Sequence, residues 1–242
     1  MTIGHPVKER DPSADAGGMG KAPRKRRRRR IVAILLAIIV VWLVTQTVVP
    51  ARGPHGRLPD LSAVSSPSRV DGQLEQVVSV VAGRGAVVRC WSHGDWKQRA
   101  AEQARQSSGQ VRHGPWSGYT SYRPVPTVHL SPELCIELTR LADLRVPVWD
   151  DESPDALALS VQALAHESVH VTGWLNEAMA QCLGMQAIQR AAVALGRTPK
   201  EGQYLAERYW TRWYRWSKKS YRSSECRNGR ALDIRPQTDV WP

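Results

Sequence analysis

The chain has 242 residues and a formal net charge of +12, and this length suits one domain with a buried core plus appended segments. Residues 1–30 hold ten Lys/Arg against three Asp/Glu, so +7 of the charge lies there and the remaining residues carry +5. No predicted helix or strand of that remainder carries a stripe of Lys or Arg. Its composition therefore argues against a nucleic-acid-binding domain.

The first 50 residues have the pattern of a signal anchor. Residues 1–30 are polar, charged and glycine-rich, which predicts a disordered tail. Their basic run, Lys21–Arg30, leads directly into the uncharged span Ile31–Pro50. As a helix this span is about 28 Å long, close to the thickness of a bilayer core. The basic cluster on one side predicts a single-pass protein of the cell membrane, with its N-terminus cytoplasmic and its C-terminal domain extracytoplasmic.

A cleaved signal peptide is the alternative for this segment. Val49 and Ala51 are small residues that suit a cleavage site, but the apolar run is longer than the usual hydrophobic region of a signal peptide. An uncleaved transmembrane anchor at residues 31–50 is therefore favoured. Residues 51–70, rich in Pro, Ser and Gly, predict a linker to a domain at residues 71–242.

The first half of that domain alternates between helix and strand patterns. The expected elements are a helix capped by Asp71 and ended at Gly83, a strand at Ala86–Trp91, a helix at Asp95–Gln106, a loop at Ser107–Gly118 and a strand at Thr127–Leu130. Pro124 and Pro126 precede the last strand and favour an edge position for it.

The second half is predicted to be helical. Three helices begin where a hydroxyl residue precedes a proline, at Ser131-Pro132, Ser153-Pro154 and Thr198-Pro199. Another helix is expected at Asn176–Leu195, ended by Gly196. The fold class is therefore α+β, rich in helix and with a small sheet.

The segment Tyr204–Arg222 is dense in Trp, Tyr, Arg and Lys. Its apolar residues form one helical stripe at Leu205, Tyr209, Trp213 and Trp216. This pattern favours a core-facing helix with a basic outer face. The alternative is contact with a membrane surface or an anionic polymer, where Trp and Arg side chains meet the interface.

Four cysteines, Cys90, Cys135, Cys182 and Cys226, lie beyond the apolar span. An even number in an oxidising compartment predicts two disulfides, for which three connectivities exist. Cys90–Cys135 with Cys182–Cys226 is the pairing we expect. A zinc cluster of four cysteines is disfavoured because no two of them are close in sequence.

The sequence HESVH, His166 to His170, has the spacing of a zinc-binding helix. His166 and His170 are one turn apart, so both imidazoles can reach one ion at about 2.1 Å. Glu167 lies beside the first ligand without taking a coordination position. It can accept a proton from a metal-bound water and deliver it to a leaving amine. The alternative is a pair of surface histidines on an amphipathic helix.

The third ligand is expected just beyond this helix. Gly173 can end the helix in a left-handed conformation and turn the chain back towards the metal. Asn176 stands where the metzincin pattern places its last ligand, but a neutral amide is a poor zinc ligand beside the carboxylate of Glu177. We therefore predict Zn²⁺ ligation by His166, His170 and Glu177. The fallback ligands are Glu201, Glu207 and Asp151.

The motif HESVH followed by NEAMA resembles a zincin-type metallopeptidase, similar to gluzincins in which a glutamate on the following helix completes the site. The chain also resembles small membrane-anchored bacterial proteins with a zinc-peptidase domain. The resemblance implies a strand before the active-site helix that binds an extended substrate by β-addition. Thr127–Leu130 is the expected strand, and His129 on it either faces the cleft or is structural.

These observations predict a membrane-anchored zinc metallopeptidase that acts on a peptide or protein substrate, with Glu167 as the catalytic base and acid. One alternative is a catalytically silent zincin-like domain that binds a partner at the cell envelope. Another is a membrane-tethered structural protein in which HESVH is incidental.

Overall fold

The computed structural model describes residues 58–61, 64, 66–106 and 117–242. The expected tail at residues 1–30, the apolar span Ile31–Pro50 and part of the linker at residues 51–70 lie outside the described residues. Within the described part of the chain, no helix combines the length and the apolar character needed to cross a membrane.

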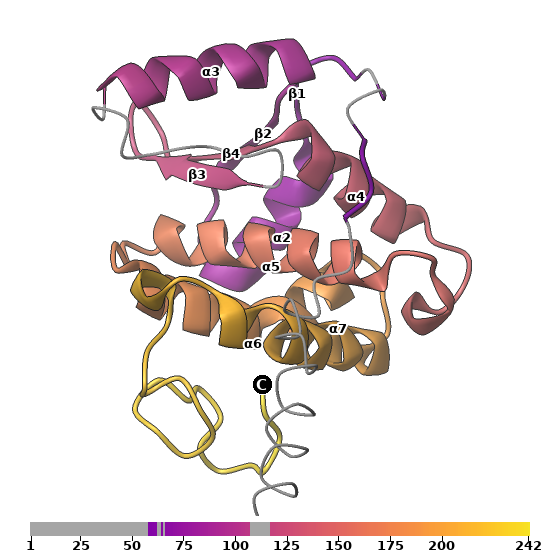
Figure 1. The fold of residues 1–242 in the computed structure, drawn as a ribbon, viewed down its shortest axis with the longest axis vertical. Helices are drawn as coiled ribbons and strands as arrows, with labels where there is room; N and C mark the ends of the chain where they lie inside the picture. The colour runs from indigo at the N-terminus through magenta and orange to yellow at the C-terminus, as the bar shows by residue number, and fades with distance from the viewer. Residues whose placement is uncertain (1–57, 62–63, 65, 107–116) are drawn as a thin grey trace, which may run out of the picture. The chain divides into compact units, whose positions relative to one another are not determined.

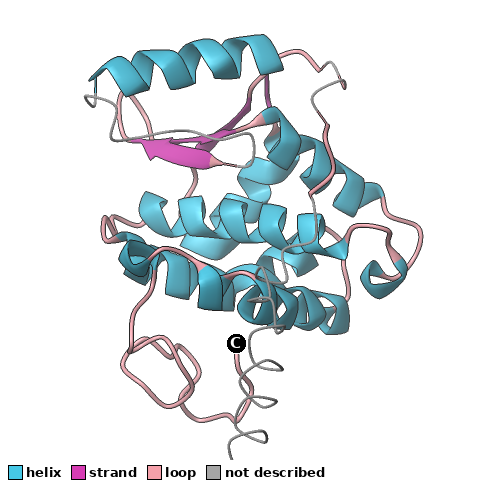
Figure 2. Ribbon diagram, viewed as in Figure 1, coloured by secondary structure: helices cyan, strands magenta, loops and turns pink. Residues whose placement is uncertain are grey.

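The domain is α+β, with helix predominating over a small sheet (Figure 2). In chain order its elements are β1 (Arg69–Val70), α2 (Gly72–Ala82), β2 (Val87–Cys90), α3 (His93–Gln106), β3 (Gly118–Ser121), β4 (Thr127–Leu130), α4 (Pro132–Asp143), η1 (Val148–Asp150), α5 (Pro154–Val171), α6 (Glu177–Ala194), α7 (Pro199–Arg212), η2 (Tyr214–Trp216) and η3 (Lys219–Tyr221). The predicted fold class is confirmed at this level.

The helices begin where their capping residues predict. Asp71 and Asn176 each accept a hydrogen bond from a backbone N–H of the first turn that follows. Thr198 and Glu201 form a reciprocal capping box at the start of α7. Ser153 precedes α5 without a side-chain cap hydrogen bond, so Pro154 at the first position is the local start signal there.

The sheet has the strand order β1-β2-β4-β3. β4 pairs with β2 in parallel and with β3 antiparallel, so the predicted edge position of Thr127–Leu130 is wrong. Pro126 lies just before the strand and its carbonyl accepts a hydrogen bond from Val87, so the prolines remove no donor from the ladder. β3 forms the edge instead, and neither β1 nor β3 was predicted from the sequence.

Helix α5 lies at the centre of the domain. Figure 1 shows α3 on one face of the sheet and α5 on the other, with α6 and α7 on the far side of α5. The face of α2 that packs into the core consists of Leu74, Val77, Val78 and Val81, as its spacing predicts. Most of α5 is buried, including His166, Glu167 and His170, so the HESVH helix is not a surface helix.

Two disulfides join distant parts of the fold. Cys90–Cys135 connects β2 to α4, and Cys182–Cys226 connects α6 to the chain that follows η3. The expected pairing is therefore confirmed.

The aromatic segment Tyr204–Arg222 is not one helix, because α7 ends at Arg212 and the short 3-10 helices η2 and η3 follow. Leu205 and Tyr209 are buried as predicted, whereas Trp216 is 58% exposed. Aromatic and β-branched residues at the end of α7 have low helix propensity. The Cys182–Cys226 bond also brings the following chain back to α6.

Candidate metal centre

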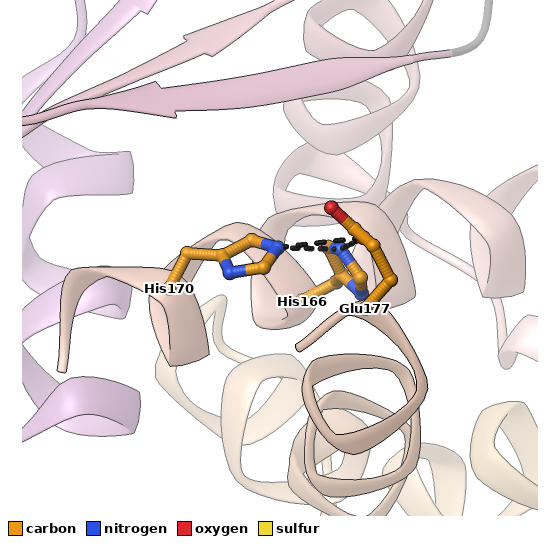
Figure 3. A group of neighbouring side chains, drawn as sticks. All are labelled: His166, His170 and Glu177. Atoms are coloured by element: carbon orange, nitrogen blue, oxygen red, sulfur yellow. Dashed lines mark hydrogen bonds and ion pairs between the residues drawn. The ribbon is translucent and has the colours of Figure 1, made fainter. Parts of the chain in front are cut away.

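Three side chains converge where α5 ends and α6 begins. His166 and His170 come from α5, and Glu177 is the first residue of α6 (Figure 3). The Nε2 atoms of the two histidines are 3.0 Å apart, and the Glu177 Oε2 lies 3.1 Å from His166 Nε2 and 3.6 Å from His170 Nε2. The structure thus brings the three predicted metal ligands together.

This arrangement fits a tetrahedral zinc site. Ligand atoms at 2.0–2.1 Å from a tetrahedral ion lie about 3.3 Å from one another, and the three separations here are 3.0, 3.1 and 3.6 Å. Two imidazoles and one carboxylate also form the donor set of zinc sites that keep an open coordination position. The residues present therefore suit Zn²⁺ in both geometry and donor chemistry.

The turn between α5 and α6 sets this geometry. Gly173 has a positive φ of 99°, a conformation that glycine adopts without steric cost, and its N–H donates to the carbonyl of His170. Asn176 then caps α6 by accepting a hydrogen bond from Met179 N at 3.0 Å. Asn176 is thus occupied as a cap, and Glu177 points to the histidines.

The second ring nitrogen orients His170. Its Nδ1 donates to the carbonyl of Trp174, which directs Nε2 to the centre and keeps the Nε2 lone pair free in the neutral ring. In their protonated forms, His166 first and then His170 stabilise the carboxylate of Glu177 and lower its pKa to about 2. Burial acts to lower the pKa of His170, but Glu177 and Glu167 stabilise the protonated ring, outweigh burial and raise that pKa.

Glu167 lies in the same cavity, one residue along α5. The single hydroxyl proton of Thr120 on β3 is shared between the Glu167 carboxylate at 2.9 Å and the Glu167 backbone carbonyl at 3.1 Å. Burial raises the pKa of Glu167, against the opposing effects of His166, His170 and Thr120. Strand β3 therefore holds the carboxylate that the sequence assigned to proton transfer.

The cavity around His166, His170 and Glu177, which we call the metal cavity, has a volume of about 620 Å³. It contains several groups that the sequence did not single out. The Tyr221 ring stacks on His166 with the centroids 6.1 Å apart. The Tyr122 hydroxyl donates to the carbonyl of His170 at 2.9 Å. Lys218 and Gly118 line the same space. They lie in β3 and η3 or directly beside these elements, in segments without a motif, so only the fold identifies them.

The fallback ligands lie elsewhere. Asp151 pairs with Arg140, Glu201 completes the capping box of α7, and Glu207 accepts a hydrogen bond from Gln203 on the surface. Gln181 lines the metal cavity, where it accepts a hydrogen bond from Gln162 at 2.9 Å.

His129 has a structural role on the opposite side of the sheet. Its ring stacks on Tyr119 and Trp91, with centroid distances of 4.4 and 5.7 Å. Trp91 Nε1 can only donate, so the His129 Nδ1 at 3.2 Å accepts, and Nε2 carries the proton that it donates to Ser121 at 2.9 Å. In this tautomer His129 cannot activate the Ser121 hydroxyl as a base.

Comparison with known proteins identified no relative of this chain. A scan against protein-family models, a search of curated proteins and a search of solved structures each found no match for this chain.

Proposed function

We propose that this protein is a membrane-anchored zinc metallopeptidase of the zincin type, similar to the gluzincins. The observation that carries the proposal is the convergence of His166, His170 and Glu177 in a cavity that also contains Glu167. A bound zinc ion supplies Lewis-acid polarisation of a carbonyl and lowers the pKa of water.

Glu167 then has the role of proton carrier. Its carboxylate accepts the proton of the attacking water and delivers it to the leaving amine of the peptide bond. Thr120 keeps one carboxylate oxygen in a fixed position by donating to Oε2. The other oxygen is left for the proton transfer.

The substrate is proposed to be an extended peptide or protein segment. Among the described residues, β3 pairs with β4 on one side only, and Gly118, Tyr119 and Thr120 of this strand line the metal cavity. An extended chain can add to such an edge by main-chain hydrogen bonds. This assigns to β3 the role that the sequence had assigned to Thr127–Leu130.

The location is proposed to be the extracytoplasmic side of the cell membrane. Two disulfides in the domain support an oxidising compartment. The apolar span Ile31–Pro50 after the basic run supports the anchor.

The test uses the full chain, purified in detergent with its disulfides formed. Zinc content is measured by mass spectrometry and cleavage is measured on a peptide library. We expect one zinc per chain in the wild type and cleavage of at least one peptide. Glu167→Gln should keep the zinc and lose at least about a hundredfold in turnover, and Glu177→Ala should lose zinc. Glu207→Gln, on the exposed side of α7, is the control and should match the wild type.

Three other results would each contradict a specific part of the proposal. Wild-type protein without stoichiometric zinc would contradict the whole site. Zinc without cleavage of any peptide would favour the catalytically silent domain that binds a partner. Zinc retained by Glu177→Ala would remove Glu177 from the ligand set.

A further inference from the structure

The positive charge of the domain is concentrated in one segment. Residues 212–230 contain seven Lys/Arg and one Asp/Glu, a net +6, whereas residues 31–242 as a whole carry +5. The rest of that region is therefore close to neutral. A local excess of this kind creates a field that attracts anions.

Part of this segment lines a second, open cavity of about 1070 Å³, slightly larger than the usual range for ligand sites. We call it the basic cavity. Its charged and aromatic lining consists of Arg215, Lys219, Arg222, Arg227, Trp210, Tyr214 and Trp216. Among the described residues, no Asp or Glu lines it.

The four cations of the basic cavity are available to a ligand. Within the described part of the chain, none of them lies within 4.0 Å of a carboxylate oxygen. Arg222 donates one hydrogen bond to the carbonyl of Arg215 at 3.0 Å, which fixes its guanidinium and leaves other N–H groups free. Guanidinium groups in such positions favour carboxylates, which they bind through two hydrogen bonds.

The walls of the basic cavity are held by the fold. Tyr214 is buried, stacks on Trp210 with the centroids 5.1 Å apart and accepts a hydrogen bond from the backbone N–H of Ser223. The Cys182–Cys226 disulfide ties the same wall to α6. A site whose groups are fixed before binding loses less conformational entropy when the ligand arrives.

The basic cavity and the metal cavity share two walls. Along the start of α6, Asn176 and Ala178 line the basic cavity, whereas Glu177 lines the metal cavity. Along η3, Lys219 lines the basic cavity and Tyr221 the metal cavity. A bound peptide that extends from the metal centre across the start of α6 or across η3 therefore enters the basic cavity within a few residues.

We propose that the basic cavity binds the carboxylate side chains of an extended acidic peptide whose neighbouring residues lie at the metal centre. Only the identification of this peptide as the substrate rests on the proposed peptidase function. Under that function, the cavity selects substrates with Glu or Asp close to the scissile bond.

A peptide suits this surface better than a lipid bilayer does. The cations line a hollow beside the metal cavity, whereas membrane-binding segments present basic and aromatic side chains on a continuous helix face. Here the helix ends at Arg212. The Trp210 ring is also stacked within the wall rather than extended outward.

The test measures binding without turnover. Full-length Glu167→Gln protein in uncharged detergent is titrated into a fluorescein-labelled peptide of alternating Glu and Ala, and into its counterpart with Gln in place of each Glu. Anisotropy gives both dissociation constants. The variant Arg215→Gln/Lys219→Gln removes two charges from the basic cavity. Arg145→Gln/Arg230→Gln removes the same charge from exposed positions that do not line it.

We expect the Glu peptide to bind about tenfold more tightly than the Gln peptide, with a preference that weakens in high salt. The preference should disappear in Arg215→Gln/Lys219→Gln and persist in Arg145→Gln/Arg230→Gln. Equal binding of both peptides to the starting protein, or equal losses in the two double variants, would overturn the proposal. So would binding of short-chain phosphatidylglycerol with no binding of either peptide.

Activity separates this inference from the peptidase function. Charge-selective binding, with no hydrolysis of any peptide by wild-type protein, would keep the basic cavity as an acidic-peptide site and remove the peptidase. Hydrolysis of library peptides without preference for Glu would keep the peptidase and remove the role of the cavity. If both hold, Glu near the scissile bond should lower KM with little change in kcat.

Discussion

Gly184 of α6 lies against the backbone of His166 on α5, so closely that a Cβ on Gly184 would be 2.8 Å from both the Cα and the N of His166. The two central helices therefore meet closely at the first predicted ligand. Glu177 lies two helical turns before Gly184 on α6, so this contact also sets the position of Glu177, the third predicted ligand, relative to His166.

Replacing Gly184 with Ala should disturb the metal centre. Alanine favours a helix by about 1 kcal/mol over glycine, but its Cβ would push α6 away from His166 and move Glu177. We expect zinc affinity to fall at least about tenfold, since small displacements of ligands are costly. The measurement is competition for zinc with a chromophoric chelator.

Gly202→Ala is the matched control for this change. A Cβ on Gly202 of α7 would lie 2.8 Å from the carbonyl oxygen of Gln189 on α6, an equally close helix contact away from the metal centre. Both variants should lose about 1–3 kcal/mol of stability through overpacking. Equal zinc affinities in the two variants would contradict a specific role for the Gly184 contact.

Thr120→Val should impair turnover without releasing metal. Valine keeps the shape of Thr120 but removes the hydroxyl that donates to Glu167, so the carboxylate loses its fixed orientation. Under the proposed function we expect kcat to fall about tenfold with unchanged zinc content. The Thr120 hydrogen bond lowers the pKa of Glu167, so its loss should move the acidic limb of the pH–rate profile to higher pH.

Thr120→Ser is the control, because it restores a hydroxyl at the same position. It should recover most of the activity and the original acidic limb. A Val variant with wild-type kcat and an unshifted profile would show that Thr120 does not position Glu167.

The sequence predicts those parts of the fold that local chemistry decides. The caps at Asp71, Asn176 and Thr198 mark helix starts because a side chain near the end of a helix satisfies its free N–H groups. The convergence of the three candidate ligands was also predictable from local spacing. His166 and His170 have a helical spacing, and Glu177 follows a glycine turn only a few residues later.

What the sequence missed depends on partners far along the chain. β3 is four residues long and becomes a strand by pairing with β4, so no local period reveals that Thr120 meets Glu167. The same limit explains the wrong edge position of Thr127–Leu130, because strand order is a property of the whole sheet. The predicted helical stripe does not continue to Trp213 and Trp216, because α7 ends at Arg212 and the chain turns back to its disulfide with α6.

Acid should destabilise the domain partly through His129. Burial, followed by the positive charges of Arg99 and Arg89, lowers the pKa of His129 to about 4 from 6.5. Between these pH values the unfolded chain binds a proton that the folded chain does not, so the stability contributed by neutral His129 is lost as the pH falls from about 6.5 to about 4. The expected decrease in the free energy of unfolding is up to about 3 kcal/mol.

The comparison that isolates this effect is His129→Gln, which can keep hydrogen bonds to Trp91 and Ser121 but does not titrate. Urea unfolding of both proteins with excess chelator should show a steeper loss of stability in the wild type between pH 6.5 and pH 4. All other titratable groups are the same in both proteins, so their contributions cancel in the difference. Parallel pH dependences would refute the assignment of a neutral buried His129.

The two disulfides should differ in function although they match in thermodynamics. Their sequence separations are 45 and 44 residues, so loss of either bond should raise the entropy of the unfolded chain by a similar amount. Each loss should lower the free energy of unfolding by about 2–4 kcal/mol. Only Cys182–Cys226 ties the wall of the basic cavity to α6.

The variant Cys182→Ala/Cys226→Ala should therefore expose the Lys and Arg residues after α7 to trypsin. In Cys90→Ala/Cys135→Ala these residues should stay as protected as they are in the wild type. Limited proteolysis followed by mass spectrometry locates the first cleavage sites, and identical early sites in the two variants would show that the C-terminal segment holds its position without this bond.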